Sequence, residues 1–236
     1  MTLTEIATAL RLSKSNVHQL LATLSKRRVI ERLPNHAYRI GIKAWEIGSR
    51  AAPLEMSRIG APHLVALSKE TSEGTSIGIL DGVESVCIQL VESPQPVRVH
   101  VPVGDRNPAH ASATGLAILA ELSDEEVIAR LPEKLEKVAS GTICDRAELL
   151  AELKRVRGRG YSVNRGGWRC DVTAIATVIR GPDGRAIAGL SVPAPSYRVT
   201  REWIAKVVPA LRATARRIEQ DLAQAVSPAP DAVGGA

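Results

Sequence analysis

Apolar side chains in residues 13–28 recur at the spacing of one face of an α-helix. Positions i, i+3, i+4 and i+7 are held by Val17, Leu20, Leu21 and Leu24, which predicts one buried stripe. Half a turn away the side chains are polar, namely Ser15, Gln19, Thr23 and Lys26, and the segment ends in Lys26-Arg27-Arg28. This pattern predicts a helix that packs on one side and presents hydrogen-bonding groups on the other.

The residues on either side of this helix predict a winged helix-turn-helix. Thr4 is a candidate cap for a short helix whose inward face would carry Ile6, Ala9 and Leu10, and Ser13 is a good N-cap for the next helix. Residues 29–33 and 38–40 read as two short strands around a turn at 34–37. A hairpin directly behind the second helix corresponds to a wing.

Residues 42–67 again have a helical pattern, interrupted near Pro53 and Pro62. Proline disfavours helix at the residue before it. We therefore expect a broken helical segment that links two domains.

From Thr75 the pattern changes to alternating strands and amphipathic helices. The predicted strands are 75–80, 84–90, 97–101, 161–164, 172–180 and 186–192, with a tight turn at Asp81-Gly82. Predicted helices cover 112–122, 124–131 and 146–157, and Thr200 caps a long closing helix. This predicts an α+β sandwich with a mostly antiparallel sheet of about six strands. Residues 227–236 are rich in Pro and Gly and are expected to be disordered.

The net charge of +6 lies entirely in the first fifth of the chain. Residues 1–50 contain nine basic and three acidic side chains, whereas the remainder contains 22 of each. A solvated basic face is the simpler explanation of a charge cluster, but together with a helix-turn-helix it indicates a DNA-binding surface. The candidates for reading bases are Lys14, Ser15, Asn16 and Gln19, and those for the DNA backbone are His18, Lys26, Arg27, Arg32 and His36.

Other classes of protein receive little support from the composition. No run of about 18 apolar residues occurs and the start lacks a signal-peptide pattern, so a cytoplasmic protein without membrane contact is expected. The three cysteines, Cys87, Cys144 and Cys170, have no CxxC spacing. We therefore expect reduced thiols and neither a disulfide framework, a metal site nor a cofactor. Phe is absent, so the core must be built from Leu, Ile, Val and Ala.

A hydrolase is one alternative, because residues 74–78 fit the pattern G-x-S-x-G with Ser76 at its centre. That motif needs a strand followed by a sharp turn into a helix. Here the Asp81-Gly82 turn leads into a second strand, so Ser76 is expected inside a hairpin. The sequence thus predicts that the protein is not an enzyme.

Five motifs in the right order resemble the IclR family of bacterial transcriptional regulators. They are LTEIA with SKSNVHQLLATL, the wing end YRIG, residues 103–115 (VGDRNPAHASATG), LKRVR through Gly160-Tyr161, and AGLSV at 188–192. The resemblance implies a winged helix-turn-helix at 1–41, a linker helix region at 42–67 and a GAF-like effector-binding domain at 68–226. It also implies a dimer or tetramer, acting as repressor or activator, and two-fold association would imply a pseudo-palindromic operator.

The chain departs from the family pattern at two places. Members usually carry another helix ahead of the one at Thr4, and without it the apolar side of the DNA-binding unit would be partly uncovered. We therefore expect either a start upstream of Met1 or a compromised domain, and a small-molecule sensor that has lost DNA binding stays open as an alternative. Gly167 stands where an acidic residue is common.

The resemblance places the effector near residues 110–115. Small residues there would let a ligand approach, and a helix starting there would direct N–H groups at an anion, which suits the small carboxylates that family members often bind. By matching position the pocket would be lined by Val99, Ala113, Thr114, Asn164, Ala174 and Ser191, with His110 and Arg98 as possible charge partners. The alternative is that these small residues serve packing alone.

Overall fold

The computed structural model describes residues 1–48 and 52–226, and the predicted disordered tail at 227–236 lies outside them. The chain divides into two compact units, Met1–Glu55 and Met56–Ala236. The segment 42–67, predicted as a linker, therefore contributes residues to each unit. The two units are described separately below.

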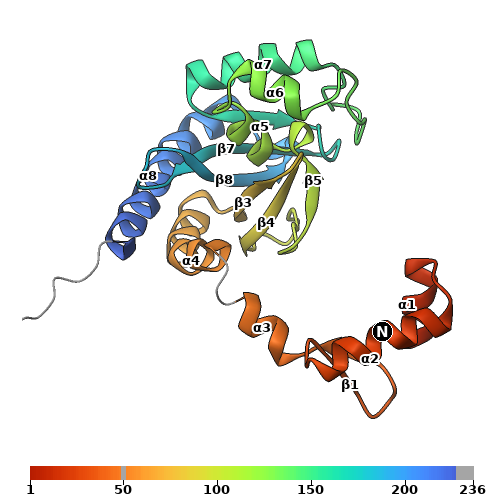
Figure 1. The fold of residues 1–236 in the computed structure, drawn as a ribbon. Helices are drawn as coiled ribbons and strands as arrows, with labels where there is room; N and C mark the ends of the chain where they lie inside the picture. Colours follow the sequence, from red (N-terminus) through yellow and green to blue (C-terminus); the bar gives the residue numbers. More distant parts are fainter. Residues whose placement is uncertain (49–51, 227–236) are drawn as a thin grey trace, which may run out of the picture. The chain divides into compact units, whose positions relative to one another are not determined.

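The first unit has the predicted order of helices and strands (Figure 1). It contains α1 (Leu3–Leu10), α2 (Lys14–Lys26), β1 (Ile30–Arg32), β2 (Tyr38–Ile40) and α3 (Ile42–Gly48). Ser13 caps α2 as predicted, since its side chain accepts from the Asn16 N–H. The cap of α1 is Thr2 and not Thr4, because Thr2 and Glu5 form a reciprocal capping box that starts the helix two residues earlier.

The core of this unit is smaller than the sequence pattern predicted. Ala7, Val17 and Leu21 are its buried members. Within the described residues, α2 packs against α1 and β1, which cover only part of its apolar stripe. Leu20 and Leu24 are consequently 51% and 38% exposed, and the predicted single buried stripe is wrong for these two leucines. Ala9 and Leu10, predicted to face inward, are also exposed because α1 turns Ala7 toward α2.

The predicted break at Pro62 does not occur. Helix α4 (Ala52–Thr71) continues through it, and Pro53 lies in the first turn, where a missing N–H costs little. An interior proline weakens a helix, but α4 buries Met56, Leu64 and Leu67 in the main core. We attribute the continuous helix to this packing.

The second unit is built on a six-stranded sheet in which every neighbouring pair is antiparallel, as predicted. The strand order is β5-β4-β3-β8-β7-β6. The strands are β3 (Thr75–Asp81), β4 (Glu84–Val91), β5 (Arg106–Pro108), β6 (Ser162–Arg165), β7 (Val172–Arg180) and β8 (Ala186–Pro195).

One predicted strand is wrong. Residues 97–101 form no strand, and β5 occupies the outer edge of β4 instead. The backbone of Cys87 accepts from the Gly104 N–H at 2.7 Å and donates to the Asp105 carbonyl at 3.0 Å. Residues 104–108 thereby take the hydrogen-bonding positions that a strand at 97–101 would have needed.

Helices cover both faces of the sheet, which confirms the predicted α+β sandwich (Figure 1). One face packs against α4 and α8 (Arg201–Val226) through a large apolar cluster that includes Ile77, Ile175 and Leu211. The other face packs against α5 (Ala113–Leu119), with α6 (Asp124–Arg130) and α7 (Arg146–Arg159) beyond it. The side chain of Ser112 caps α5 by accepting from the Gly115 N–H at 2.9 Å.

Gly115 lets the start of α5 approach the short 3-10 helix at Ala109–Ala111 closely. A Cβ at Gly115 would overlap the backbone of Ala109. We expect Gly115→Ala to destabilise the second unit by about 1–3 kcal/mol, even though alanine is the better helix former by about 1 kcal/mol. Urea unfolding of the full chain measures this change.

The matched control is Gly158→Ala in α7, where an added Cβ would meet nothing within 4 Å. We expect that variant to be stabilised by about 0.5–1 kcal/mol. Equal stabilisation of both variants would contradict the close packing assigned to Gly115.

Candidate functional site

The predicted DNA-binding side chains are all exposed on the first unit. This holds for Lys14, Ser15, Asn16, His18, Gln19, Lys26, Arg27, Arg32 and His36. The Ser13 cap fixes where α2 begins and hence which way its first turn faces. Ser15, Gln19 and Lys26 lie on the side of α2 opposite the buried Val17 and Leu21.

Two of the predicted base-reading residues share one shallow hollow. Asn16 and Gln19 line it together with Leu12, Leu20 and Thr23. Leu20 was predicted to be buried, but it contributes apolar surface beside these amides. This surface therefore offers both hydrogen-bonding amides and an apolar contact, the two kinds of group that read base edges.

The wing brings Arg32 and His36 together. Arg32 Nη2 lies 3.0 Å from His36 Nδ1, and because a guanidinium can only donate, Nδ1 is the acceptor. Arg39, on the neighbouring strand, forms an ion pair with Glu31 at 2.7 Å. Arg32 therefore remains the better candidate for a phosphate contact, because the charge of Arg39 is already partnered.

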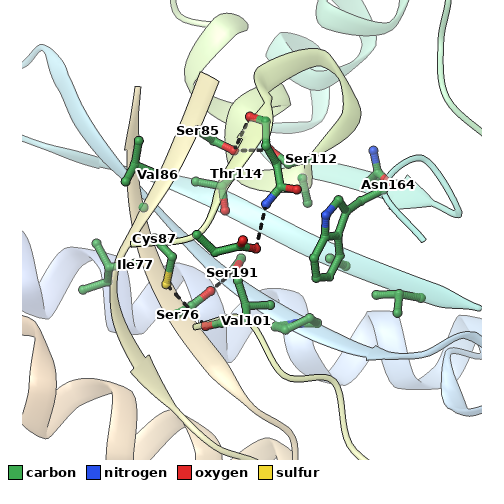
Figure 2. Close-up of a pocket in the computed structure, with 18 residues that line it drawn as sticks. Ser76, Ile77, Ser85, Val86, Cys87, Val101, Ser112, Thr114, Asn164 and Ser191 are labelled. Atoms are coloured by element: carbon green, nitrogen blue, oxygen red, sulfur yellow. Dashed lines mark hydrogen bonds between the residues drawn. The ribbon is translucent and has the colours of Figure 1, made fainter. Parts of the chain in front are cut away.

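A pocket opens in the second unit between the sheet and the start of α5 (Figure 2). The cavity volume is about 60 Å³. Residues of all six strands, the first residues of α5 and the loops before β5 and β7 line it.

Five of the seven predicted effector residues line this pocket, namely Ala113, Thr114, Asn164, Ala174 and Ser191. Val99 and His110 do not. Val99 is buried in the non-strand segment 97–101, outside the sheet that forms the wall. His110 is buried within the 3-10 helix, and its Nε2 lies 2.9 Å from the Glu136 carbonyl oxygen.

Hydrogen bonds between lining residues hold the walls in place. Ser76 Oγ and Ser191 Oγ lie 2.8 Å apart across β3 and β8 (Figure 2). Asn164 donates to the Ala111 carbonyl at 3.1 Å and accepts from the Gly167 N–H at 2.9 Å. Glycine suits position 167, since a Cβ there would lie 2.6 Å from Asn164 Nδ2.

Sequence reasoning missed most of the other lining residues, and among them Cys87, Asp105 and Trp168 carry the most distinctive chemistry. Burial raises the pKa of the Cys87 thiol to about 11, so this cysteine is protonated near neutral pH. Asp105 Oδ2 accepts from Asn107 Nδ2 at 3.1 Å. Asp105 lies inside the 103–115 motif, which was a usable signal, whereas no pattern singled out Trp168 in its glycine-containing loop.

The structure also bears on the hydrolase alternative. Ser76 lies within β3, and the chain turns at Gly82, which has a φ of 62°, directly into β4. The strand-to-helix elbow that the G-x-S-x-G motif requires is therefore not formed at Ser76. The predicted hairpin placement of this serine is confirmed.

Neither the first 48 residues nor residues 52–226 contain a group of three or more His, Cys, Asp or Glu side chains that could hold a metal ion. In the same ranges no helix combines the length and apolar character needed to cross a membrane.

Comparison with known proteins assigns both units to the same family. Residues 51–220 match the family model for the bacterial transcriptional regulator IclR C-terminal domain, and residues 1–34 match the IclR helix-turn-helix domain. The regulator BhcR of Paracoccus denitrificans is 32% identical over 94% of this chain and 81% of its own, and KipR of Bacillus subtilis is 27% identical over 94% and 90%. An IclR homolog from Microbacterium hydrocarbonoxydans, crystallised with 4-hydroxybenzoate, is 27% identical over 94% of this chain and 91% of its own, with a TM-score of 0.84. The chain belongs to the IclR family of helix-turn-helix transcriptional regulators, whose DNA binding is modulated by a ligand.

Proposed function

We propose that this protein is a one-component regulator in which the first unit binds an operator and the pocket beside α5 binds a small organic effector. The observation that carries the proposal is that one chain holds both an exposed helix-turn-helix face and a preformed pocket. Effector occupancy would change operator affinity through the segment 42–67, because that segment joins the two units. The protein would act in the cytoplasm, where bacterial DNA lies.

Asn16 and Gln19 are the proposed base readers, with Lys14 and Ser15 beside them at the start of α2. Amide side chains can form two hydrogen bonds with adenine in the major groove. His18, Lys26, Arg27, Arg32 and His36 would contact the DNA backbone and set the register of the complex. The excess of basic residues in the first 50 positions supports this assignment.

Self-association is part of the proposal. A dimer or tetramer would place two recognition helices on one face of the duplex and would require a pseudo-palindromic operator. Ile40, Trp45 and Ile47 are 74%, 66% and 63% exposed on the first unit, which supports a role for this surface in association.

For the effector, Ala113, Thr114, Asn164, Ala174 and Ser191 are the proposed pocket residues that agree with the resemblance. The lining is mostly apolar, with a few hydroxyl and amide groups and the carboxylate of Asp105, and a mainly apolar lining with a few polar groups is common in small-molecule sites. The complex of the Microbacterium homolog with 4-hydroxybenzoate supports a small organic ligand.

The experiment that tests the regulator is DNA binding by the full chain. Binding to the region upstream of its own gene is compared with binding to random DNA of equal length across salt concentrations. We expect specific binding that weakens with salt, with a slope set by the number of phosphates contacted. Equal binding of both DNAs, or none, would contradict the proposal and favour a sensor that does not bind DNA.

A further inference from the structure

The side chains that line the proposed effector pocket carry a net negative charge. Asp105 is the one charged side chain among its lining residues in the described part of the chain. The neighbouring Arg106 forms ion pairs on the surface with Asp81 at 2.5 Å and Glu84 at 2.8 Å. The resemblance favours a carboxylate effector, but such a ligand would enter a pocket that already holds a negative charge and no cation.

The amide groups at the start of α5 offset this charge only in part. The Ser112 N–H donates to the Ala109 carbonyl, and the Gly115 N–H donates to Ser112 Oγ. Two of the N–H groups expected to bind an anion are therefore already used.

The carboxylate of Asp105 can accept hydrogen bonds from a ligand. Asn107 Nδ2 donates to its Oδ2 at 3.1 Å, and an ionised carboxyl group has about four lone-pair positions on its two oxygens. The bond from Asn107 therefore fixes the carboxylate and leaves it further capacity.

Trp168 gives the pocket an aromatic wall. It reaches the pocket from the loop between β6 and β7, and the guanidinium of Arg169 lies 4.0 Å from the centre of its ring. Arg169 does not line the pocket itself. An indole ring offers a large flat apolar surface that suits a planar ligand.

We propose that the effector is a planar molecule carrying a positively charged nitrogen group, with that group paired to Asp105 and its flat body against Trp168. This inference rests on the proposed function of the pocket as the effector site. Opposite charges in a partly enclosed site attract strongly, whereas two carboxylates there repel each other. We therefore expect a ligand with a cationic group to bind most tightly, one with a neutral amide less tightly, and one with a carboxylate least tightly.

The test uses three planar compounds of the same shape: benzamidinium, benzamide and benzoate. Calorimetric titration of the full chain at neutral pH measures each affinity. Dissociation constants near 1 mM are expected for compounds of about nine non-hydrogen atoms. We expect benzamidinium to bind at least about tenfold more tightly than benzoate. Tighter or equal binding of benzoate, or no binding of any compound, would overturn the proposal.

Two variants assign the effect to its residue. Asp105→Asn should remove the preference for the cation, whereas Asp183→Asn, which removes the same charge from the β7–β8 turn, should keep it. Thermal unfolding of each variant confirms that it is folded. An unchanged preference in Asp105→Asn, or benzoate binding that depends on Arg169, would contradict the role of Asp105.

DNA binding by the ligand-free protein is measured in parallel. Failure to bind DNA would contradict the proposed regulator, whereas the order of the three affinities tests the pocket alone. The two failures are thereby distinguishable.

Discussion

Replacing Asn16 or Gln19 by alanine is expected to reduce discrimination between operator and random DNA by about 1–3 kcal/mol for each residue that pairs with a base. Both side chains are exposed on α2 and share one hollow. Neither substitution removes buried surface, so the fold should stay intact. The ratio of the two dissociation constants, measured at one salt concentration, gives the discrimination directly.

Arg27→Ala is the matched control for this prediction. Arg27 is exposed at the carboxyl end of α2 and carries a charge suited to phosphate. We expect its loss to weaken operator and random DNA about equally and to reduce the salt slope by about 1. If the Asn16 and Gln19 variants also lost affinity equally for both DNAs, the base-reading assignment would be wrong.

Local signals in the sequence predicted most of the fold. The Ser13 cap, the Asp81-Gly82 turn and the helix that starts at Arg146 each depend on residues close in the chain, and the structure confirms all three. The errors concern choices that tertiary contacts decide. Residues 97–101 alternate like a strand, but residues 104–108 hydrogen-bond to the edge of β4 in their place.

Burial was harder to predict than helix position. The spacing of Leu20 and Leu24 is correct for a packed stripe, yet burial also needs a partner surface, and α1 and β1 cover only Val17 and Leu21. Pro62 shows the opposite case, because packing of Leu64 and Leu67 maintains a helix that the local sequence disfavours.

The candidate pocket was predicted in part for the same reason. Matching positions located Ala113, Thr114 and Ser191, which lie in regular elements shared with the family. Asp105 and Trp168 enter the pocket from loops, whose paths cannot be read from periodicity. His110 was misplaced because the direction of its side chain depends on a single 3-10 turn and on Glu136.

Glu73→Gln is expected to destabilise the second unit by about 2–4 kcal/mol. Glu73 is 3% exposed and forms two bonds with Arg198, Nε to Oε1 at 2.5 Å and Nη2 to Oε2 at 2.9 Å. Hydrogen bonding to Glu73 raises the pKa of Arg198. The neutral amide would leave the guanidinium partly buried without its counter-charge, and removing one partner of such a pair is costly.

The effect should extend to the pocket, because this ion pair ties three segments together. Arg198 also donates to the Val97 carbonyl at 2.9 Å, and Ser93 donates to Glu73 at 3.4 Å. Residues 93–97 are followed, after three further residues, by Val101, which lines the pocket. Loosening them should weaken effector binding as well as stability.

Glu92→Gln is the control, since Glu92 pairs with Arg98 at 3.0 Å in the same region but is 46% exposed. An exposed pair contributes about 0–1 kcal/mol, so urea unfolding should shift little for this variant. The comparison isolates burial, because both substitutions replace a glutamate that pairs with an arginine by its neutral isostere. If Glu73→Gln were no more destabilising than Glu92→Gln, the pair with Arg198 would not be holding these segments together.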